Sequence, residues 1–152
     1  MYYPLFINLK NKKILIIGGG KVGSRRALYL LEAGALVTVI SKEFDKKLEI
    51  KNKHLKIIKK EINEKKLNEI SLKNYFLVIT ATNDKKINEK ITKKIKNRAL
   101  VCRADNYRLG NVIFPAVLKA GKNTLAFTTF GKNPKLSKEV KRVLKQQYST
   151  NL

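Results

Sequence analysis

A glycine-rich loop is the first motif of this chain whose residue types and spacing suit a chemical role. Its sequence, Gly18-Gly19-Gly20-Lys21-Val22-Gly23, has the pattern Gly-x-Gly-x-x-Gly. The loop follows an apolar run at 13–17 and opens a helical pattern, which is the context of a dinucleotide-binding turn. In such a turn Gly18 permits the tight bend, Gly20 lets the backbone approach a pyrophosphate, and Gly23 lets the helix pack against the strand. The first backbone N–H groups of the helix would then face the phosphates. An ordinary strand-to-helix turn is the alternative.

The end of the second expected strand, at 36–40, bears on the choice of cofactor. An Asp or Glu at this position would bond the ribose of NAD, whereas a cation would accommodate the extra phosphate of NADP. Ser41 and Lys42 stand there instead, and Glu43 follows them. We expect Ser41 to bond a ribose hydroxyl, but these residues alone leave the choice between NAD and NADP open.

A second group of small polar residues, Thr80-Ala81-Thr82-Asn83-Asp84, ends the apolar run at 75–81. Ligands of open parallel sheets bind at the carboxyl ends of the strands. Thr82 and Asn83 are therefore candidates for contacts with the ribose or the nicotinamide of a bound cofactor. Asn83 or Asp84 could equally cap the helix that follows.

Asp105 follows the fifth expected strand and falls on the same edge of the sheet as the glycine loop. A carboxylate at that edge could act as a general base or bind a metal ion. Aspartate is also a common turn residue, so the residue type leaves both interpretations open.

The elements that must position these residues alternate between strand and helix along the first two thirds of the chain. Short β-branched runs predict strands, and apolar residues spaced three and four apart predict helices. The expected strands are 13–17, 36–40, 55–58, 75–81 and 99–102, and the expected helices are 22–33, part of 62–70 and the segment carrying Ile87, Ile91 and Ile95. We expect Gly34 to end the first helix. This order predicts an α/β fold with a Rossmann-type, doubly wound parallel sheet.

The pattern changes after residue 105. Two strands are expected at 112–117 and 124–128 with a turn at 121–123, and Asn133-Pro134 then opens a C-terminal helix. The last residues, 146–152, are expected to fray. We therefore divide the chain into a dinucleotide-binding part, 1–106, and a part formed by the two strands and the helix, 107–152, within one compact unit.

The net charge of the 152-residue chain is +23, from 34 basic and 11 acidic side chains. A lysine-rich solvated surface, a nucleic-acid partner and an anionic ligand could each account for it. The excess is spread along the whole chain rather than gathered in a tail, which speaks against nucleic acid.

Other features of the composition narrow the class of protein. One cysteine, Cys102, and one histidine, His54, cannot supply a disulfide or the usual zinc ligands, so no metal site is expected. We expect Cys102 to be a small apolar residue in a strand. No apolar run is long enough for a membrane span and the N-terminus does not read as a secretory signal, so we expect a cytoplasmic protein without a membrane partner.

In five blocks the sequence resembles the precorrin-2 dehydrogenases, a family that includes the N-terminal module of bacterial sirohaem synthase. The order and spacing of these blocks are more specific than the glycine motif alone. The blocks are Tyr3-Pro4-Leu5-Phe6; the glycine loop with Arg25-Arg26 and 31–35; 81–84 with Ile87-Asn88; 113–116; and 128–134.

The resemblance implies an enzyme that oxidises precorrin-2 to sirohydrochlorin with NAD. Some family members also insert ferrous iron and others only dehydrogenate, so both remain open. Asp105 matches the essential aspartate of the family. The resemblance also implies a homodimer formed through residues 110–130. Precorrin-2 is an anionic tetrapyrrole, and the residues expected to bind it are Arg103, Arg108, Thr129 and Lys132.

The sequence departs from the family pattern in three places. It ends at residue 152, where many relatives continue into a helical domain, so we expect a more open cleft. Phe130-Gly131 stands in place of a Gly-Gly pair, and Thr129 in place of a serine. Two other functions fit part of the sequence. A non-catalytic NAD-sensing module does not predict the blocks at 113–134, and a nucleic-acid-binding protein leaves the glycine loop unexplained.

Overall fold

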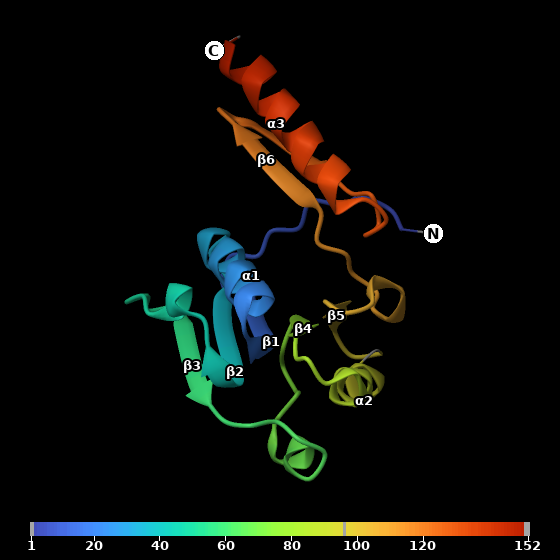
Figure 1. The fold of residues 1–152 in the computed structure, drawn as a ribbon. Helices are drawn as coiled ribbons and strands as arrows, with labels where there is room; N and C mark the ends of the chain where they lie inside the picture. The colour runs from blue at the N-terminus through green and yellow to red at the C-terminus, as the bar shows by residue number, and fades with distance from the viewer. Residues whose placement is uncertain (1, 96, 151–152) are drawn as a thin grey trace. The chain divides into compact units, whose positions relative to one another are not determined.

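The computed structural model describes residues 2–95 and 97–150 and divides the chain into two compact units, 1–112 and 113–152. The first unit is a five-stranded parallel sheet with the strand order β3-β2-β1-β4-β5 (Figure 1). Its strands are β1 (Lys13–Gly19), β2 (Leu36–Phe44), β3 (Leu55–Lys59), β4 (Leu77–Thr80) and β5 (Leu100–Arg103). Its helices are α1 (Lys21–Glu32) and α2 (Lys85–Ile95), with single 3-10 turns η1 (Lys46–Leu48), η2 (Lys66–Glu69) and η3 (Tyr107–Leu109). The predicted doubly wound α/β fold is confirmed.

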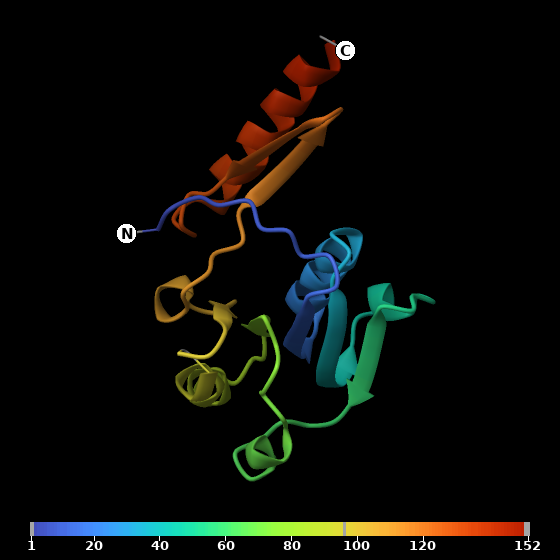
Figure 2. The same ribbon diagram turned by 180° about the vertical axis from the view of Figure 1, so that it is seen from behind.

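The apolar residues of the strands are buried on both faces of the sheet, as expected for parallel strands covered by helices. One face packs against α2 and η2 through a cluster made by Leu15, Ile17, Ile40, Leu67, Val78, Ile87, Ile91, Ile95 and Val101. Because side chains alternate along a strand, Ile14 and Ile16 lie on the opposite face, where α1 contacts β1 and β2. Figure 2 shows this unit from behind.

The strand β2 runs further than the sequence predicts, to Phe44 rather than to residue 40. Ile17 pairs with Ile40, but the next pair is Gly19 with Phe44, so the residues 41–43 of β2 lie opposite Gly18 alone. The N–H of Asp45 then donates to the carbonyl of Gly19 at 2.8 Å. This backbone pairing extends the strand. The apolar run at 36–40 gives no sign of it, so the sequence predicts a shorter strand.

The end of α1 and the start of α2 lie at capping residues that the sequence indicates. Gly34 follows α1 with φ of 78°, the left-handed conformation expected of a glycine at a helix end. The carboxylate of Asp84 accepts from the N–H groups of Lys86 and Ile87, which makes it the cap of α2. Of the two caps considered for this helix, the structure selects Asp84.

The segment after β5 stays with the first unit as far as Val112, whereas we expected the division after residue 106. The N–H groups of Asn111 and Val112 both donate to the carbonyl of Val101, and the side chain of Asn111 accepts from the N–H of Val101 at 2.6 Å. A strand starting at residue 112 was wrong for the same reason. Pro115, which has no N–H to donate, immediately precedes the strand that does form.

The second unit is a β-hairpin covered by one helix. Its strands are β6 (Ala116–Ala120) and β7 (Asn123–Phe127), which pair antiparallel, and α3 (Pro134–Thr150) packs against β6. The side chain of Asn133 accepts from the N–H of Leu136 at the start of α3. The helix extends to Thr150, so residues 146–150, expected to fray, are helical.

No helix among the described residues is long and apolar enough to cross a membrane.

Candidate functional site

The glycine loop is packed against the end of β4. A Cβ atom on Gly18, whose φ is 110°, would lie 2.3 Å from the carbonyl oxygen of Ala81 and 2.9 Å from the nitrogen of Thr82. A Cβ atom on Gly23 would lie 1.9 Å from the carbonyl oxygen of Gly18. Only glycine fits at these two positions without a shift of the backbone. The close helix–strand packing expected from Gly23 is therefore present.

Gly20 differs from its neighbours because a Cβ atom there would meet no atom within 4 Å. Gly20 is the N-cap of α1, and no side chain caps this helix or places an acid in its first turn. Lys21, Val22 and Gly23 form that first turn, so their N–H groups are available to an anion together with the positive end of the helix dipole. This combination of open space and an uncapped helix start fits a pyrophosphate.

Ser41 lies beside the glycine loop, where we expected it. A Cβ atom on Gly19 would come 3.0 Å from the Cβ of Ser41 and 2.5 Å from the ring of Phe44. The motif allows any residue at position 19, so the sequence pattern did not indicate that a glycine is needed there. The structure leaves no room for a side chain at Gly19. The neighbouring Lys42 reaches Glu61 at 3.5 Å, a pair in which both side chains are exposed.

Asn88 of α2 holds the turn that carries Thr82 and Asn83. The hydroxyl of Thr82 donates to Asn88 Oδ1 at 2.7 Å, and Asn88 Nδ2 donates to the carbonyl of Thr82 at 3.0 Å. Asn88 is fully buried, whereas Asn83 is exposed at the turn. Sequence reasoning assigned no site role to Asn88, although a polar residue within the apolar stripe of α2 is a signal that could have identified it.

Asp105 lies at the end of β5 in a bidentate ion pair with Arg103. Arg103 Nε donates to Asp105 Oδ1 at 3.0 Å, and Arg103 Nη2 donates to Asp105 Oδ2. The Arg103 side chain is 3% exposed and that of Asp105 is 16% exposed, although the main chain at Asp105 is open to solvent. The predicted contact between Arg103 and a substrate carboxylate stays a prediction, but the structure gives this guanidinium a partner inside the chain.

Burial raises the pKa of the Asp105 carboxyl, but other interactions outweigh it. The hydrogen bond and the charge of Arg103, a backbone N–H and a hydrogen bond from Asn88 all favour the carboxylate, so the pKa lies below its ordinary value. Asp105 is therefore charged at neutral pH. A group with this pKa is a fixed anion that can stabilise positive charge or accept a proton only transiently.

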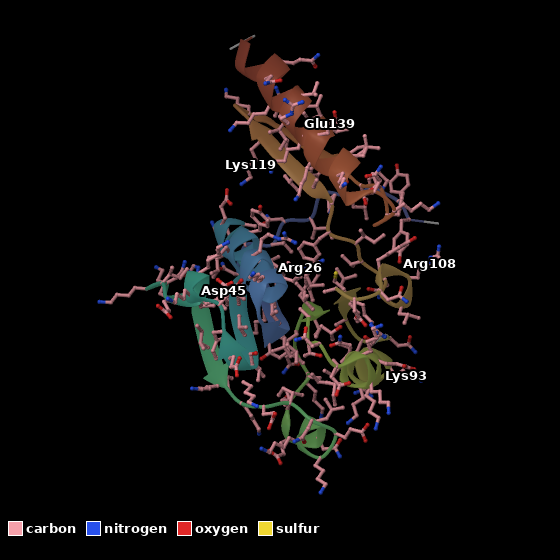
Figure 3. All side chains as sticks on the ribbon, in the orientation of Figure 1. Arg26, Asp45, Lys93, Arg108, Lys119 and Glu139 are labelled. Atoms are coloured by element: carbon pink, nitrogen blue, oxygen red, sulfur yellow. The ribbon has the colours of Figure 1, made fainter. Side chains whose placement is uncertain are left out.

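The remaining predicted substrate contacts lie in two parts of the chain. Arg108 is an exposed residue of η3 (Figure 3). Its guanidinium lies over the ring of Tyr107, 5.8 Å from the centroid. Thr129 and Lys132 belong to the second unit. The Thr129 hydroxyl bonds within the turn before α3, donating to the carbonyl of Asn133 at 3.1 Å, whereas the Lys132 side chain is exposed.

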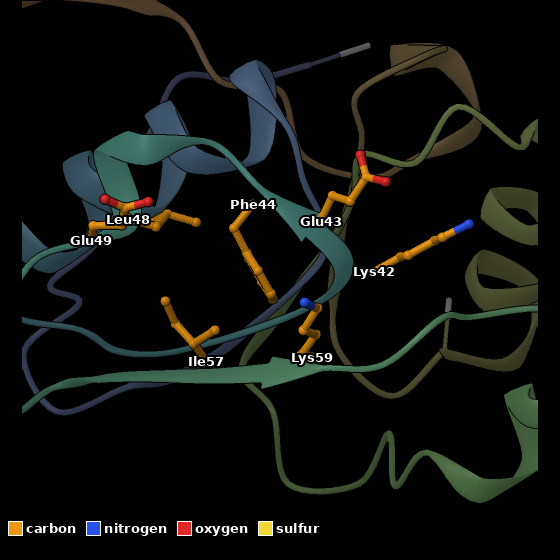
Figure 4. Close-up of a pocket in the computed structure, with 7 residues that line it drawn as sticks. All are labelled: Lys42, Glu43, Phe44, Leu48, Glu49, Ile57 and Lys59. Atoms are coloured by element: carbon orange, nitrogen blue, oxygen red, sulfur yellow. The ribbon is translucent and has the colours of Figure 1, made fainter.

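A pocket of about 550 Å³ lies at the β2–β3 edge of the sheet (Figure 4). It is lined by Lys42, Glu43, Phe44, Leu48, Glu49, Ile57 and Lys59. None of the predicted cofactor-binding or catalytic residues lines it. We therefore place the candidate site at the carboxyl ends of β1, β4 and β5, where the perturbed carboxylate and the glycine loop are, and not in this pocket. Across residues 2–95 and 97–150, no three His, Cys, Asp or Glu side chains gather as a metal-binding group.

Comparison with known proteins shows the family of this chain. Residues 5–116 match a protein family described as NAD(P)-binding. The chain is 32% identical to the precorrin-2 dehydrogenase of Priestia megaterium over 96% of this chain and 71% of that protein. It belongs to the precorrin-2 dehydrogenase family.

A solved structure and a second sequence relative agree with this family. The solved structure of the precorrin-2 dehydrogenase SirC superimposes with a TM-score of 0.76 at 31% identity, covering 97% of this chain and 71% of that one. The siroheme synthase of Buchnera aphidicola is 37% identical over 89% of this chain but only 28% of its own length. The resemblance noted from the five sequence blocks is thus confirmed.

Proposed function

We propose that this protein oxidises precorrin-2 to sirohydrochlorin with NAD, in siroheme biosynthesis. One observation carries the proposal: Gly18, Thr82 and Asp105 lie at the carboxyl ends of three neighbouring strands, β1, β4 and β5. This edge brings an anion-binding helix start and a charged carboxylate into one unit of the fold. The choice of precorrin-2 as the substrate follows from the relatives that are named precorrin-2 dehydrogenase.

Residues at three positions of this edge would bind the cofactor. The backbone of Gly18 and Gly20 and the first turn of α1 would hold the pyrophosphate, because the space at Gly20 is open and the helix start is uncapped. The Ser41 hydroxyl would bond a ribose, and the Thr82–Asn83 turn, held by Asn88, would border the nicotinamide. NAD, when bound, accepts the hydride that the oxidation removes.

Asp105 acts on the substrate side of this arrangement. Dehydrogenation removes a proton as well as a hydride, and positive charge develops on the tetrapyrrole as the hydride leaves. A carboxylate that stays ionised at neutral pH stabilises that charge and takes up the proton for transfer to solvent. Arg108 and Lys132, both exposed cations, would attract the carboxylates of the substrate.

We also propose a homodimer contact through residues 110–130, most of which belong to the second unit. A two-stranded hairpin is marginally stable by itself, and here one helix covers only one of its faces. Leu118, on the covered face, is 6% exposed, whereas Val117, on the other face, is 40% exposed. A second copy of the chain would bury that open face.

The experiment that tests the function mixes the purified protein with enzymatically generated precorrin-2 and NAD, without metal, and follows NADH absorbance and the spectrum of sirohydrochlorin. We expect both signals to appear together, and Asp105→Ala to abolish them while leaving NAD binding unchanged. NAD binding without turnover by the unaltered protein would favour the sensing module instead. Full activity in Asp105→Ala would remove this carboxylate from the reaction.

A further inference from the structure

Arg103 is placed unusually for a charged residue. It lies on β5 two residues after Val101, so it faces the same side of the sheet as the apolar cluster packed against α2. Its side chain is 3% exposed, and two of its three nitrogens are used by one partner, Asp105. The third, Nη1, is buried with no hydrogen-bond partner; within the described residues the only other such side-chain atom is Thr80 Oγ1.

Stability alone does not account for this arrangement. A buried ion pair stabilises a fold little more than apolar side chains of the same volume, because removing both charges from water offsets their attraction. The unpartnered Nη1 adds a further cost, since a buried donor without an acceptor has lost its bonds to water. An apolar residue on this face of β5 would extend the cluster of Val78 and Val101 without either cost.

The geometry of the pair indicates what Arg103 does for its neighbour. The planar guanidinium binds both oxygens of Asp105 at once and thereby fixes the plane of the carboxylate. β5 packs against α2 and the Arg103 side chain is almost fully buried, so the carboxylate has a rigid support. Each oxygen keeps a second lone pair that Arg103 does not occupy.

We propose that Arg103 is a positioning residue that holds the Asp105 carboxylate ionised and in one orientation at the end of β5. The proposal rests on the role proposed above for Asp105. In this role Arg103 acts through the two hydrogen bonds that it donates to Asp105, and it needs no contact of its own with substrate or cofactor.

Charged and polar groups from α2 also face the pair. Asn88 adds to the effect of Arg103 in lowering the pKa of the Asp105 carboxyl, against the opposing effect of burial. Glu89 interacts with the charge of Arg103, and Lys93 forms an ion pair with Glu89 at 2.6 Å. Both Glu89 and Lys93 are largely exposed, so solvent screens them more than it screens Arg103.

The test titrates Asp105 directly in the apo protein. The sequence has three aspartates, Asp45, Asp84 and Asp105, so carboxyl ¹³C labelling of aspartate gives three resonances, and Asp105→Asn identifies the third. In Arg103→Met we expect the titration midpoint of Asp105 to rise by about one pH unit or more, because an adjacent cation lowers a carboxyl pKa by that amount. Arg98→Met, an exposed arginine elsewhere in the unit, is the matched control and should leave the midpoint unchanged.

Arg103→Lys separates charge from orientation and serves also if Arg103→Met does not fold. A lysine keeps the cation but cannot form the bidentate pair. We expect most of the low midpoint to remain while kcat falls at least tenfold with little change in KM. In Arg103→Met, the acidic limb of the kcat profile should move upward in parallel with the titration.

Two results would overturn the proposal: an unchanged Asp105 midpoint in folded Arg103→Met, or wild-type kcat in Arg103→Lys. Failure of the proposed function looks different. If the unaltered protein oxidised no precorrin-2, the titration would still report the effect of Arg103 on the Asp105 carboxylate, and only the catalytic consequence would be lost.

Discussion

The hydroxyl of Thr82 donates to the buried side-chain oxygen of Asn88 across 2.7 Å, which ties the turn after β4 to the helix that follows it. Asn88 closes this link by donating back to the carbonyl of Thr82, and it also helps to lower the pKa of the Asp105 carboxyl. One amide thus supports both the cofactor side and the carboxylate side of the candidate site.

Asn88→Ala should therefore weaken both stability and binding. Losing a buried amide leaves the Thr82 turn without its partner, at a cost of about 1–3 kcal/mol in the free energy of unfolding. We expect the Kd for NAD to rise several-fold as the turn loosens. Urea unfolding and NAD titration measure the two effects, with exposed Asn68→Ala as the control. Equal Kd values for Asn88→Ala and the unaltered protein would argue against a role for this turn in cofactor binding.

Two glycine substitutions should separate folding from cofactor binding. Gly23→Ala places a methyl group 1.9 Å from the carbonyl oxygen of Gly18, so we expect a large loss of stability. Gly20→Ala enters open space, so the unfolding free energy should change by less than about 1 kcal/mol. Its methyl group would nevertheless stand where the pyrophosphate approaches, and the Kd for NAD should rise at least tenfold. Thermal unfolding with and without NAD distinguishes the two variants.

The ion pair at Asp105 predicts a specific dependence of stability on pH. Because the folded pKa of Asp105 lies below its unfolded value near 3.8, its contribution is complete above that pH and is lost as the pH falls through the folded pKa. Asp105→Asn should cost roughly 2 kcal/mol at pH 7, since it leaves the Arg103 guanidinium without its anion. The deficit relative to the unaltered protein should shrink in urea unfolding below pH 4. A deficit independent of pH would mean that the charge of Asp105 is not what stabilises the fold.

An exposed cation near the site should affect substrate capture more than chemistry. Arg108→Gln is expected to raise the KM for precorrin-2 several-fold with little change in kcat, and to reduce the dependence of kcat/KM on ionic strength. Lys46→Gln removes an equally exposed charge on η1 and serves as the control. If both variants raised KM alike, the effect would come from the overall charge of +23 rather than from Arg108.

Self-association should depend on the open face of the hairpin. Val117→Asp places a charge among residues that the proposed dimer would bury, so sedimentation should shift from dimer to monomer. Val143→Asp, which alters an exposed apolar side chain of α3 outside residues 110–130, is the matched control. A monomer in the unaltered protein would refute the dimer without affecting the proposed oxidation.

The sequence predicts the architecture well where a local signal is strong. The glycine loop, the apolar runs of the strands and the caps at Gly34 and Asp84 are local features, and the structure has each of them. The start of β6 and the extent of β2 depend on backbone partners distant in sequence, Val101 and Gly19, so local patterns misplaced both.

The site was harder to predict because residue type does not reveal which way a side chain faces. The prediction that Arg103 binds the substrate rested on its charge alone. It did not include the alternation of side chains from Val101, which turns Arg103 toward the interior beside Asp105. Asn88 was named in a family block but given no site role, because its neighbours Ile87 and Ile91 dominate the helical pattern.

The position of β1 in the middle of the sheet has a consequence for how the protein is made. β1 is the first strand to leave the ribosome, but one of its neighbours is β4, and the glycine loop rests on Ala81 and Thr82 just beyond it. A nascent chain that ends before these residues carries the whole glycine motif without the surface that shapes it. We therefore expect the nascent chain to bind NAD only after it has grown past β4 and β4 has paired with β1. From that stage onward NAD would stabilise the newly folded unit.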